Sequence, residues 1–270
     1  MTIHIFLTEI QKDRPGPDSE LHLLRAGLRA MGAGQRADTF SAEDLAAAPD
    51  GKPFFRSFPD IHFNLSHSGE YLAGAFSSDE VGLDLQENRA SHTGVLRIAK
   101  RFFTMEEYES LLSCGGSREQ ELLFYRLWTI KEAYLKYLGC GLHGSLSGFR
   151  PDPMPDCRSP RTLSLSEDNT ASILLCPPRG QAALQPLSPA ARGAVPAVPS
   201  AEPLFSGTIL RKEENENTRD ENTGDGSPCS HSKHSETSPV SFFILPAPAG
   251  YTMTLCGSLL LHCDVRIRQL

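Results

Sequence analysis

Three short segments of the chain combine side chains that could act on a phosphate. The first runs from Phe63 to Gly69 (FNLSHSG), where small polar residues accompany the titratable His67. Backbone and hydroxyl donors beside a histidine suit a phosphate or pyrophosphate group. The alternative interpretation is an ordinary polar turn that carries an exposed histidine.

The second segment, from Val81 to Gln86 (VGLDLQ), places a carboxylate inside an apolar strand. An unpaired carboxylate is costly there. Asp84 and Gln86 are two residues apart, so both point to the same face of a strand. A buried carboxylate beside an amide oxygen could bind a hard cation such as Mg²⁺. The alternative places Asp84 at an exposed strand end, where it caps the next turn.

The third segment runs from Trp128 to Leu142 (WTIKEAYLKYLGCGL). On a helix, Trp128, Glu132 and Lys136 follow one another at intervals of four residues and form one stripe. A solvated, salt-bridged face is the usual interpretation of Glu and Lys at this spacing. The stripe includes the only tryptophan of the chain, however, which indicates that this face contacts something. Apolar residues surround much of the helix, so we expect it to be central.

These segments need a mixed framework of strands and helices to hold them. Short apolar runs predict strands at 2–8, 61–65, 71–76, 81–85, 241–245 and 251–255. Helical spacing predicts helices at 19–31, about 104–113 and about 119–138. Ser19 is the expected N-cap of the first helix, and Gly139 ends the last one.

Composition and charge exclude several classes of protein. The chain has 270 residues and a formal net charge of −7, which argues against a basic coat for nucleic acid or an anionic membrane. No apolar run reaches the 18 residues of a spanning helix, and the first residues read as a strand, not as a signal peptide. Seven cysteines without a C-x-x-C pair predict no disulfide framework and a cytoplasmic location.

Proline is concentrated in the second half of the chain, and residues 177–240 are rich in Pro, Ala and Ser before they become polar. Such a stretch buries too little apolar surface to offset its ordering entropy. We therefore expect an N-terminal half at 1–88, a C-terminal half at 89–176 plus 241–263, and a disordered insert at 177–240.

Taken together, the motifs resemble one family, the 4'-phosphopantetheinyl transferases of the Sfp type. The resemblance is carried by Lys52-Pro53, FNLSHSG (63–69), GLDLQ (82–86), RFFTMEEY (101–108) and WTIKEAYLKYLGCGL (128–142). Both the order and the spacing fit. The resemblance covers residues 50–150 well, residues 1–50 loosely and residues 241–256 faintly.

The resemblance implies an α+β fold in which two similar halves are related by a pseudo-twofold axis, with the active site in the cleft between them. It implies transfer of 4'-phosphopantetheine from coenzyme A to a serine of an apo acyl or peptidyl carrier protein. The reaction would release 3',5'-ADP and depend on Mg²⁺. It also implies a monomer. The carrier protein itself stays open.

The resemblance also assigns roles to single residues. The implied metal ligands are Asp84, Glu132, Gln86 and Glu107. Lys136 would pair with the pyrophosphate or protonate the leaving group, and Glu132 would help to deprotonate the carrier serine. The implied coenzyme A contacts are Lys52, Ser66, His67, Lys131 and Arg25. Many family members carry an acid at the position of Gln86, so weaker metal binding is expected, and the role of Glu107 is either metal-linked or structural.

Two other functions stay open at this point. One is a catalytically degenerate relative that binds coenzyme A or a partner, which Gln86 and the short first half would explain. The other is a different Mg²⁺-dependent phosphate enzyme such as a phosphodiesterase. The second alternative explains the acidic residues but not the SHSG and WTIKEA segments together.

Overall fold

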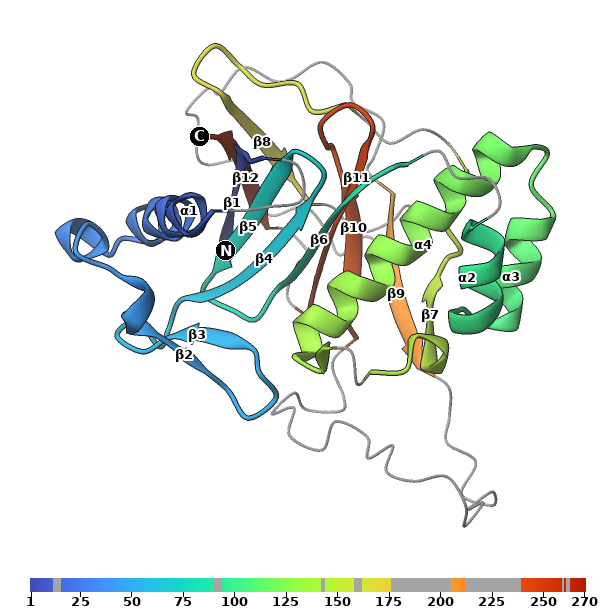
Figure 1. Cartoon of the computed structure of the whole chain (residues 1–270), viewed down its shortest axis with the longest axis horizontal. Coiled ribbons are helices and arrows are strands. Elements are labelled where there is room, and N and C mark those ends of the chain that lie inside the picture. Colours follow the sequence, from blue (N-terminus) through green and yellow to red (C-terminus); the bar gives the residue numbers. More distant parts are fainter. Residues whose placement is uncertain are drawn as a thin grey trace, which may run out of the picture.

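A computed structural model of the chain describes residues 1–11, 16–89, 94–141, 144–157, 162–175, 205–211, 239–258, 260 and 263–270. Two five-stranded sheets and four α-helices dominate this part of the chain (Figure 1). The class is therefore α+β, as expected. None of the described helices is long and apolar enough to cross a membrane.

The first sheet has the strand order β4-β5-β1-β12-β8. Its strands are β1 (Thr2–Glu9), β4 (His62–Ser68), β5 (Tyr71–Ser77), β8 (Thr170–Leu174) and β12 (Asp264–Gln269). The central strand β1 pairs antiparallel with β5 and parallel with β12. A strand from near the end of the chain thus lies beside its first strand.

The second sheet is antiparallel and has the order β6-β11-β10-β9-β7. Its strands are β6 (Gly82–Glu87), β7 (Phe149–Asp152), β9 (Ser206–Arg211), β10 (Ser241–Leu245) and β11 (Tyr251–Gly257). A separate small hairpin joins β2 (Leu45–Ala47) to β3 (Pro53–Phe55).

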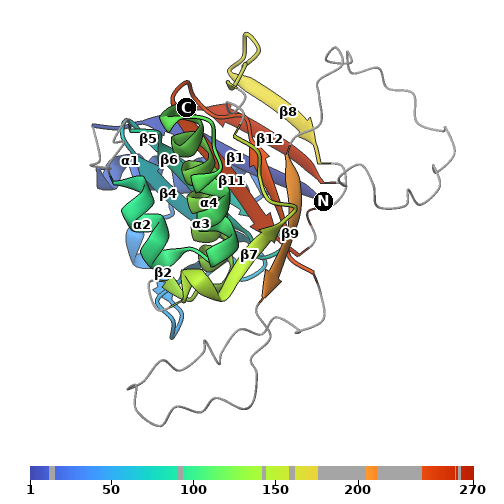
Figure 2. The same ribbon diagram turned by 90° about the vertical axis from the view of Figure 1, so that its right-hand side faces the viewer.

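The helices cover the outer faces of the sheets and leave the inner faces to pack on each other. They are α1 (Pro17–Ala30), α2 (Val95–Phe102), α3 (Met105–Leu112) and α4 (Ser117–Leu138), with short 3₁₀ turns η1 (Gly34–Ala37), η2 (Ala42–Asp44) and η4 (Leu146–Gly148). α1 packs on the first sheet and α4 on the second. α2 and α3 lie against the first half of α4 (Figure 2).

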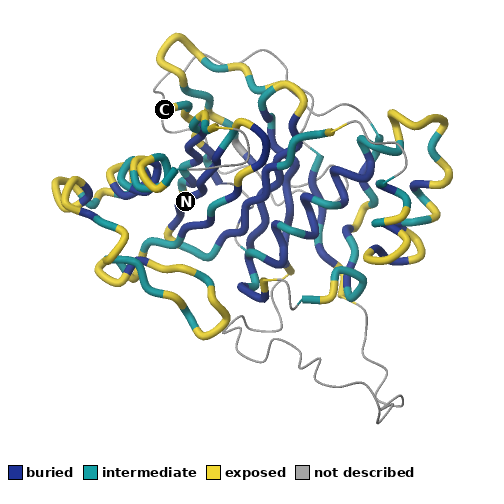
Figure 3. The backbone as a smooth tube through the Cα atoms, in the orientation of Figure 1, coloured by how far each residue is buried: buried dark blue, intermediate teal, exposed yellow. Residues whose placement is uncertain are grey.

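Alternation along the strands explains this layering. In β10, Phe243 and Leu245 face the first sheet, whereas Phe242 and Ile244 contact α4. A strand buried on both faces reads as a continuous apolar run, which is how SFFIL reads. The most buried backbone accordingly follows the central strands and α4 (Figure 3).

Most local elements agree with the sequence-based predictions within a few residues, but their assembly differs. α2, the hairpin β2–β3 and the strands β7, β8, β9 and β12 were not predicted. β6 precedes residue 88 yet pairs in the second sheet, while β8 and β12 follow it yet pair in the first. The boundary at residue 88 therefore does not separate the two sheets.

Two further expectations need correction. The insert predicted at 177–240 lies mostly outside the described residues, but its residues 206–211 form β9, and β12 extends the structured part beyond residue 263. Among the described cysteines, Cys114, Cys157, Cys256 and Cys263 carry free thiols, whereas Cys140 is disulfide-bonded. The expectation of no disulfide framework did not foresee this bonded cysteine.

Candidate active site

The two sheets meet at their edge strands β4 and β6. Along this seam, side chains of β4 bind the backbone of β6 in place of backbone–backbone hydrogen bonds. Three polar residues of β4 accept backbone N–H groups of β6. The hydrogen bonds join Leu83 N to Asn64 Oδ1 (2.9 Å), Leu85 N to Ser66 Oγ (3.0 Å) and Glu87 N to Ser68 Oγ (3.0 Å). The three acceptors alternate along β4 because every second residue of a strand faces the same way. The FNLSHSG segment is thus a strand that joins the sheets, and the polar-turn interpretation is wrong for it.

Asp84 lies in this seam and faces α4. Leu83 and Leu85 point into the core between the sheets, so the intervening Asp84 points the opposite way. Its Oδ1 accepts hydrogen bonds from Ser66 Oγ at 2.9 Å and from Lys136 Nζ at 2.7 Å. Ser66 Oγ also accepts from Lys136 Nζ at 2.9 Å. Asp84, Ser66 and Lys136 therefore form one buried polar cluster.

The second oxygen of Asp84 has no such support. Asp84 is 5% exposed, and its Oδ2 is buried without a hydrogen-bond partner. An unsatisfied buried carboxylate oxygen is costly and calls for an explanation, such as an ion that is not part of the chain. This oxygen fits a hard cation, for which carboxylates are the preferred ligands.

Glu132 brings a second carboxylate to the cluster from α4. It precedes Lys136 by one helical turn, so both side chains lie on the stripe that faces β6. Burial raises the pKa of Glu132, and the nearby Asp84 carboxylate raises it further, while the Lys136 ammonium opposes both. Two carboxylates that destabilise each other are a suitable environment for a divalent cation. Within the described ranges, no three His, Cys, Asp or Glu side chains converge as a metal site.

Gln86 lies two residues beyond Asp84 on the same face of β6. Its Nε2 donates to Ser68 Oγ at 3.0 Å and to the carbonyl of Glu87 at 3.2 Å. These acceptors occupy the two N–H groups of the amide and fix its orientation. The amide oxygen is therefore the atom that Gln86 can offer to a cation beside Asp84.

α4 can approach β6 this closely because β6 begins with glycine. A Cβ on Gly82 would lie 1.9 Å from the carbonyl oxygen of Ala133 and 2.5 Å from the backbone nitrogen of Tyr137. Any larger residue would push the helix away from the strand and would separate Glu132 and Lys136 from Asp84.

Gly82→Ala is therefore expected to reduce the free energy of unfolding by about 3 kcal/mol, as overpacking against backbone does. Denaturant titration measures the loss. Gly116→Ala is the matched control, because a Cβ there meets nothing within 4 Å. Equal stability of the two variants would contradict the close packing of α4 on β6.

Glu107 and Lys131 do not belong to this cluster. Glu107 Oε1 pairs with Lys131 Nζ at 2.9 Å, and both side chains are 0% exposed. Glu107 Oε2 accepts from the backbone N–H of Thr104 as part of a capping box at the start of α3. Lys131 donates to the carbonyls of Leu146 and Phe149 at 2.6 and 2.7 Å. Of the two roles left open for Glu107, these contacts favour the structural one, and the ammonium of Lys131, expected to contact coenzyme A, is directed to Glu107 and to the two carbonyls instead.

Lys52 lines a neighbouring cavity of about 600 Å³, together with Phe54, Phe55, Phe58, His62, Glu80 and others. Its ammonium pairs with Glu80 Oε2 and donates to the carbonyl of Tyr137 at 3.1 Å. Glu80 Oε1 lies 3.0 Å from His62 Nδ1. The lysine expected to contact coenzyme A thus already has a carboxylate partner.

The acidity of Glu80 follows from this arrangement. Burial opposes ionisation of Glu80, but the hydrogen bond from His62 and the charge of Lys52 outweigh burial and lower its pKa to about 2. A carboxylate with a lowered pKa stabilises the fold above its unfolded pKa, about 4.3, and that contribution is lost as the pH falls toward the folded value.

Glu80→Gln should therefore make the stability less dependent on pH between about 5 and 2. Thermal unfolding midpoints of both proteins across this range test the expectation. If the variant and the unmodified protein lose the same stability on acidification, the Lys52–Glu80–His62 cluster does not exist in solution.

Two other expected ligand contacts lie apart from Asp84. Arg25 directs Nε and Nη2 to the carbonyl of Phe40 at 2.9 and 2.7 Å. His67 is exposed, and it faces away from its neighbour Ser66 because successive strand residues alternate. The structure thus unites Asp84, Ser66, Glu132 and Lys136, with Gln86 alongside, and does not bring Arg25 or His67 to them.

Sequence reasoning missed three residues that shape the site: Asn64, Ser68 and Glu80. The spacing of Asn64, Ser66 and Ser68 carried a usable signal, because polar residues at every second position of a strand indicate one polar face. Glu80 carried none, because its partners Lys52 and His62 lie far from it in sequence.

Comparisons with known proteins concern the part of the chain that builds this site. Residues 80–177 match the model of the 4'-phosphopantetheinyl transferase superfamily. A 4'-phosphopantetheinyl transferase of Bacillus pumilus is 41% identical over 126 residues, 47% of this chain and 47% of that protein. The 4'-phosphopantetheinyl transferase Sfp of Bacillus subtilis (strain 168) is 42% identical over 99 residues, 37% of this chain and 42% of that protein.

A more distant relative comes from an animal. The L-aminoadipate-semialdehyde dehydrogenase-phosphopantetheinyl transferase of Rattus norvegicus is 32% identical over 121 residues, 41% of this chain and 39% of that protein. The chain spans about half the length of the curated relatives it matches. The matched residues 80–177 hold Asp84, Glu132 and Lys136, and over this part the chain is similar to 4'-phosphopantetheinyl transferases, among them Sfp of Bacillus subtilis.

Proposed function

We propose that this protein transfers the 4'-phosphopantetheine group of coenzyme A to a serine hydroxyl of an apo carrier protein, with release of 3',5'-ADP. The observation that carries the proposal is the buried cluster of Asp84, Glu132 and Lys136, with one carboxylate oxygen left without a partner. Attack of a hydroxyl on a pyrophosphate requires alignment and charge neutralisation above all. The cluster offers charges of both signs at one place.

Asp84 and Glu132 would hold Mg²⁺, with the amide oxygen of Gln86 as a neutral third ligand. The ion would supply Lewis-acid stabilisation of the pyrophosphate. Gln86 would bring one negative charge fewer than a carboxylate, so the site should bind the ion less tightly than one with three carboxylates.

The remaining roles fall to side chains of the chain itself. Glu132 would accept the proton of the carrier serine, a task that suits a carboxylate whose pKa is raised by burial. Lys136 would neutralise the pyrophosphate or protonate the leaving group. Ser66 donates to Asp84 and accepts from Lys136, and it would hold both in place. Lys52, which lines the neighbouring cavity, would contact a phosphate of coenzyme A.

The layered fold supports a cleft between two related halves. Each five-stranded sheet carries one helix on its outer face, α1 or α4, as a pseudo-twofold arrangement would require. β4 of one sheet and β6 of the other meet at Asp84. We propose that coenzyme A binds along this seam and that the protein acts as a cytoplasmic monomer.

A second candidate is a coenzyme A-binding protein that has lost the transfer reaction. The observation in its favour is Gln86, an amide at a position where the resemblance to the Sfp type implies an acid. The intact cluster of Asp84, Glu132 and Lys136 favours the enzyme.

Intact-mass measurement of apo carrier proteins tests the two candidates. The carriers are incubated with this protein, coenzyme A and Mg²⁺, and parallel samples contain a chelator. A metal-dependent mass gain of one phosphopantetheine establishes the transfer. Coenzyme A binding without a mass gain on any fatty-acid, polyketide or peptide carrier would support the degenerate binder.

The Glu80 carboxylate is expected to weaken the affinity for the released nucleotide, because it pairs with Lys52. Glu80 neutralises Lys52, so Glu80→Gln should tighten binding of 3',5'-ADP about three- to tenfold, as removal of a nearby negative charge in a partly screened site would do. Calorimetric titration without carrier measures this. Asp79→Asn on the same turn is the matched control, because Asp79 is bonded by Ser78 and not by Lys52.

Lys52→Met separates the two ways in which this prediction could fail. If Lys52→Met weakens 3',5'-ADP binding but Glu80→Gln leaves it unchanged, Glu80 does not oppose the ligand. If neither variant changes the affinity, Lys52 is not a nucleotide contact.

A further inference from the structure

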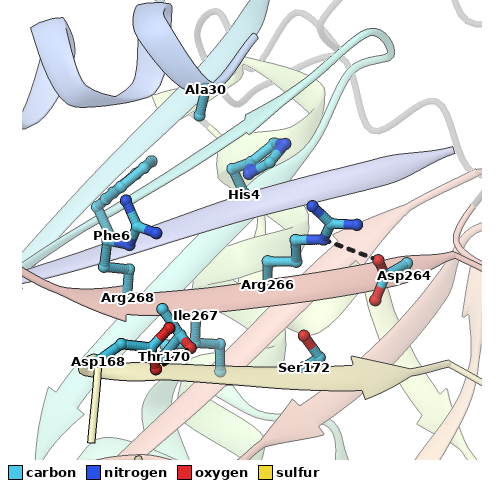
Figure 4. Close-up of a pocket in the computed structure, with 10 residues that line it drawn as sticks. All are labelled: His4, Phe6, Ala30, Asp168, Thr170, Ser172, Asp264, Arg266, Ile267 and Arg268. Atoms are coloured by element: carbon cyan, nitrogen blue, oxygen red, sulfur yellow. Dashed lines mark hydrogen bonds and ion pairs between the residues drawn. The ribbon is translucent and has the colours of Figure 1, made fainter. Parts of the chain in front are cut away.

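A second cavity, of about 520 Å³, opens on the outer face of the first sheet, beside the end of α1 (Figure 4). Its walls come from β1, β12, β8 and the turn before β8. The side chains that line it include His4, Arg266, Arg268, Ser172 and Thr170. This face points away from the core between the sheets, and none of the residues of the candidate active site lines the cavity.

The strand register explains why these side chains lie together. In the pairing of β1, β12 and β8, His4 is beside Arg266, which is beside Ser172. The next row on the same face begins with Phe6 and continues with Arg268 and Thr170. Neighbouring residues in such a row have Cβ atoms about 5 Å apart. Two guanidinium groups, a hydroxyl and an imidazole therefore lie in one small area.

The charged side chains in this area differ in whether they have a partner. Arg266 Nε donates to Asp264 Oδ2 at 3.0 Å. Asp168, at the other end of the cavity, accepts hydrogen bonds from the hydroxyls of Ser166 and Thr170 in its own turn. Within the described part of the chain, the side chain of Arg268 makes neither a hydrogen bond nor an ion pair, although its backbone lies in the paired strand β12, and this side chain points into the cavity (Figure 4).

The direction in which the pKa of His4 is shifted indicates the sign of the electrostatic potential in the cavity. Burial lowers the pKa of His4, Arg266 and Arg268 lower it further, and only Asp264 acts in the opposite direction. The imidazole therefore experiences a net positive environment although two aspartates border the cavity. A bound anion would reverse this effect.

We propose that this cavity is a second ligand site that binds a single phosphoryl or sulfate-type oxyanion between Arg266, Arg268, Ser172 and His4. Guanidinium groups bind such oxyanions through paired N–H donors, and the Ser172 hydroxyl adds a further donor. Asp168 and Asp264 would repel a polyanion, so the site suits one compact tetrahedral group. That group is either a free anion or the phosphoryl group of a small phosphate ester.

The imidazole of His4 provides a readout that does not depend on enzymatic activity. Its NMR signals, assigned by their loss in His4→Gln, are followed in the full chain during titration with inorganic phosphate, and with chloride at matched ionic strength. Phosphate is expected to raise the pKa of His4 in a saturable manner, and chloride is not. Tighter binding of glycerol phosphate than of inorganic phosphate would identify an ester as the ligand class, whereas equal affinity would identify the free anion.

Arginine variants decide whether the response belongs to this site. Arg268→Gln is expected to weaken phosphate binding about tenfold, as loss of one charge-assisted contact does. Arg150→Gln, on β7 of the other sheet, should leave it unchanged. Asp264→Asn should tighten binding because it releases Arg266. A His4 signal that does not respond to phosphate, or a response unchanged in Arg268→Gln, would overturn the proposal.

Discussion

Asp84→Asn is expected to reduce transfer of phosphopantetheine by roughly 10²–10³-fold, the loss found when one preorganised electrostatic group is removed from an active site. The substitution keeps the shape of the side chain and removes its charge. The Lys136 ammonium would then lose its ion pair of 2.7 Å, and the oxygen that now has no partner would no longer be anionic. Both changes remove charge complementarity at the point where the pyrophosphate would react.

The measurement is kcat/KM for an apo carrier as a function of Mg²⁺ concentration. If Asp84 is a metal ligand, the variant should require more Mg²⁺ and should still be slower at saturation. Asp79→Asn carries the same chemical change on the turn before β6 and should keep the unmodified rate. Glu132→Gln should match Asp84→Asn, with the exposed Glu109 of α3 as its control (Glu109→Gln). If Asp84→Asn and Glu132→Gln both keep the unmodified rate, the assignment of the active site to these two residues is wrong, even if the protein is a transferase.

Lys131→Met is expected to cause the largest loss of stability, about 3–5 kcal/mol, which is the usual effect of removing one partner of a buried ion pair. Lys131 and Glu107 are both 0% exposed. The ammonium also joins α4 to the carbonyls of Leu146 and Phe149, and it lies 4.6 Å from the ring centroid of Phe149. Its removal would leave the Glu107 carboxylate and two carbonyls without a cation.

Denaturant unfolding of three variants tests this expectation. Lys100→Met removes an exposed lysine of α2 and should change the stability by less than about 1 kcal/mol. The double variant Glu107→Gln with Lys131→Met should recover part of the loss, because no charge is then left buried without a partner. A single variant as stable as Lys100→Met would show that the pair is not structural.

Periodicity within single segments predicted most of the local structure. The alternating or continuous apolar runs that mark β1, β4, β5, β6, β10 and β11 depend only on neighbouring residues. The helical stripe of Trp128, Glu132 and Lys136 likewise follows from the spacing of residues within one helix. Glu132 and Lys136 do face Asp84, whereas Trp128 packs against Phe124 in the cluster with α2 and α3.

Which strands pair with each other could not be predicted from periodicity within single segments. β12 reads as alternating apolar and basic residues, and nothing in the sequence near it shows that its neighbour is β1. The same limit applies to β8 and β9, which are short and lie beside proline-rich sequence. Pairing energy depends on the residues opposite a strand and on burial, and both are properties of the assembled sheet.

The sequence by itself determined which residues could do chemistry: Asp84, Gln86, Glu132 and Lys136 stand in motifs whose spacing places them on one strand face and one helix stripe. Only the tertiary structure decided what each charge contacts. From the sequence, Lys131 and Lys52 were both candidates to contact coenzyme A. In the fold, Lys131 pairs with Glu107 and Lys52 pairs with Glu80. The reason is physical, because a strand or a helix fixes directions over a few residues, whereas an ion pair depends on distances between segments that the chain brings together only when it folds.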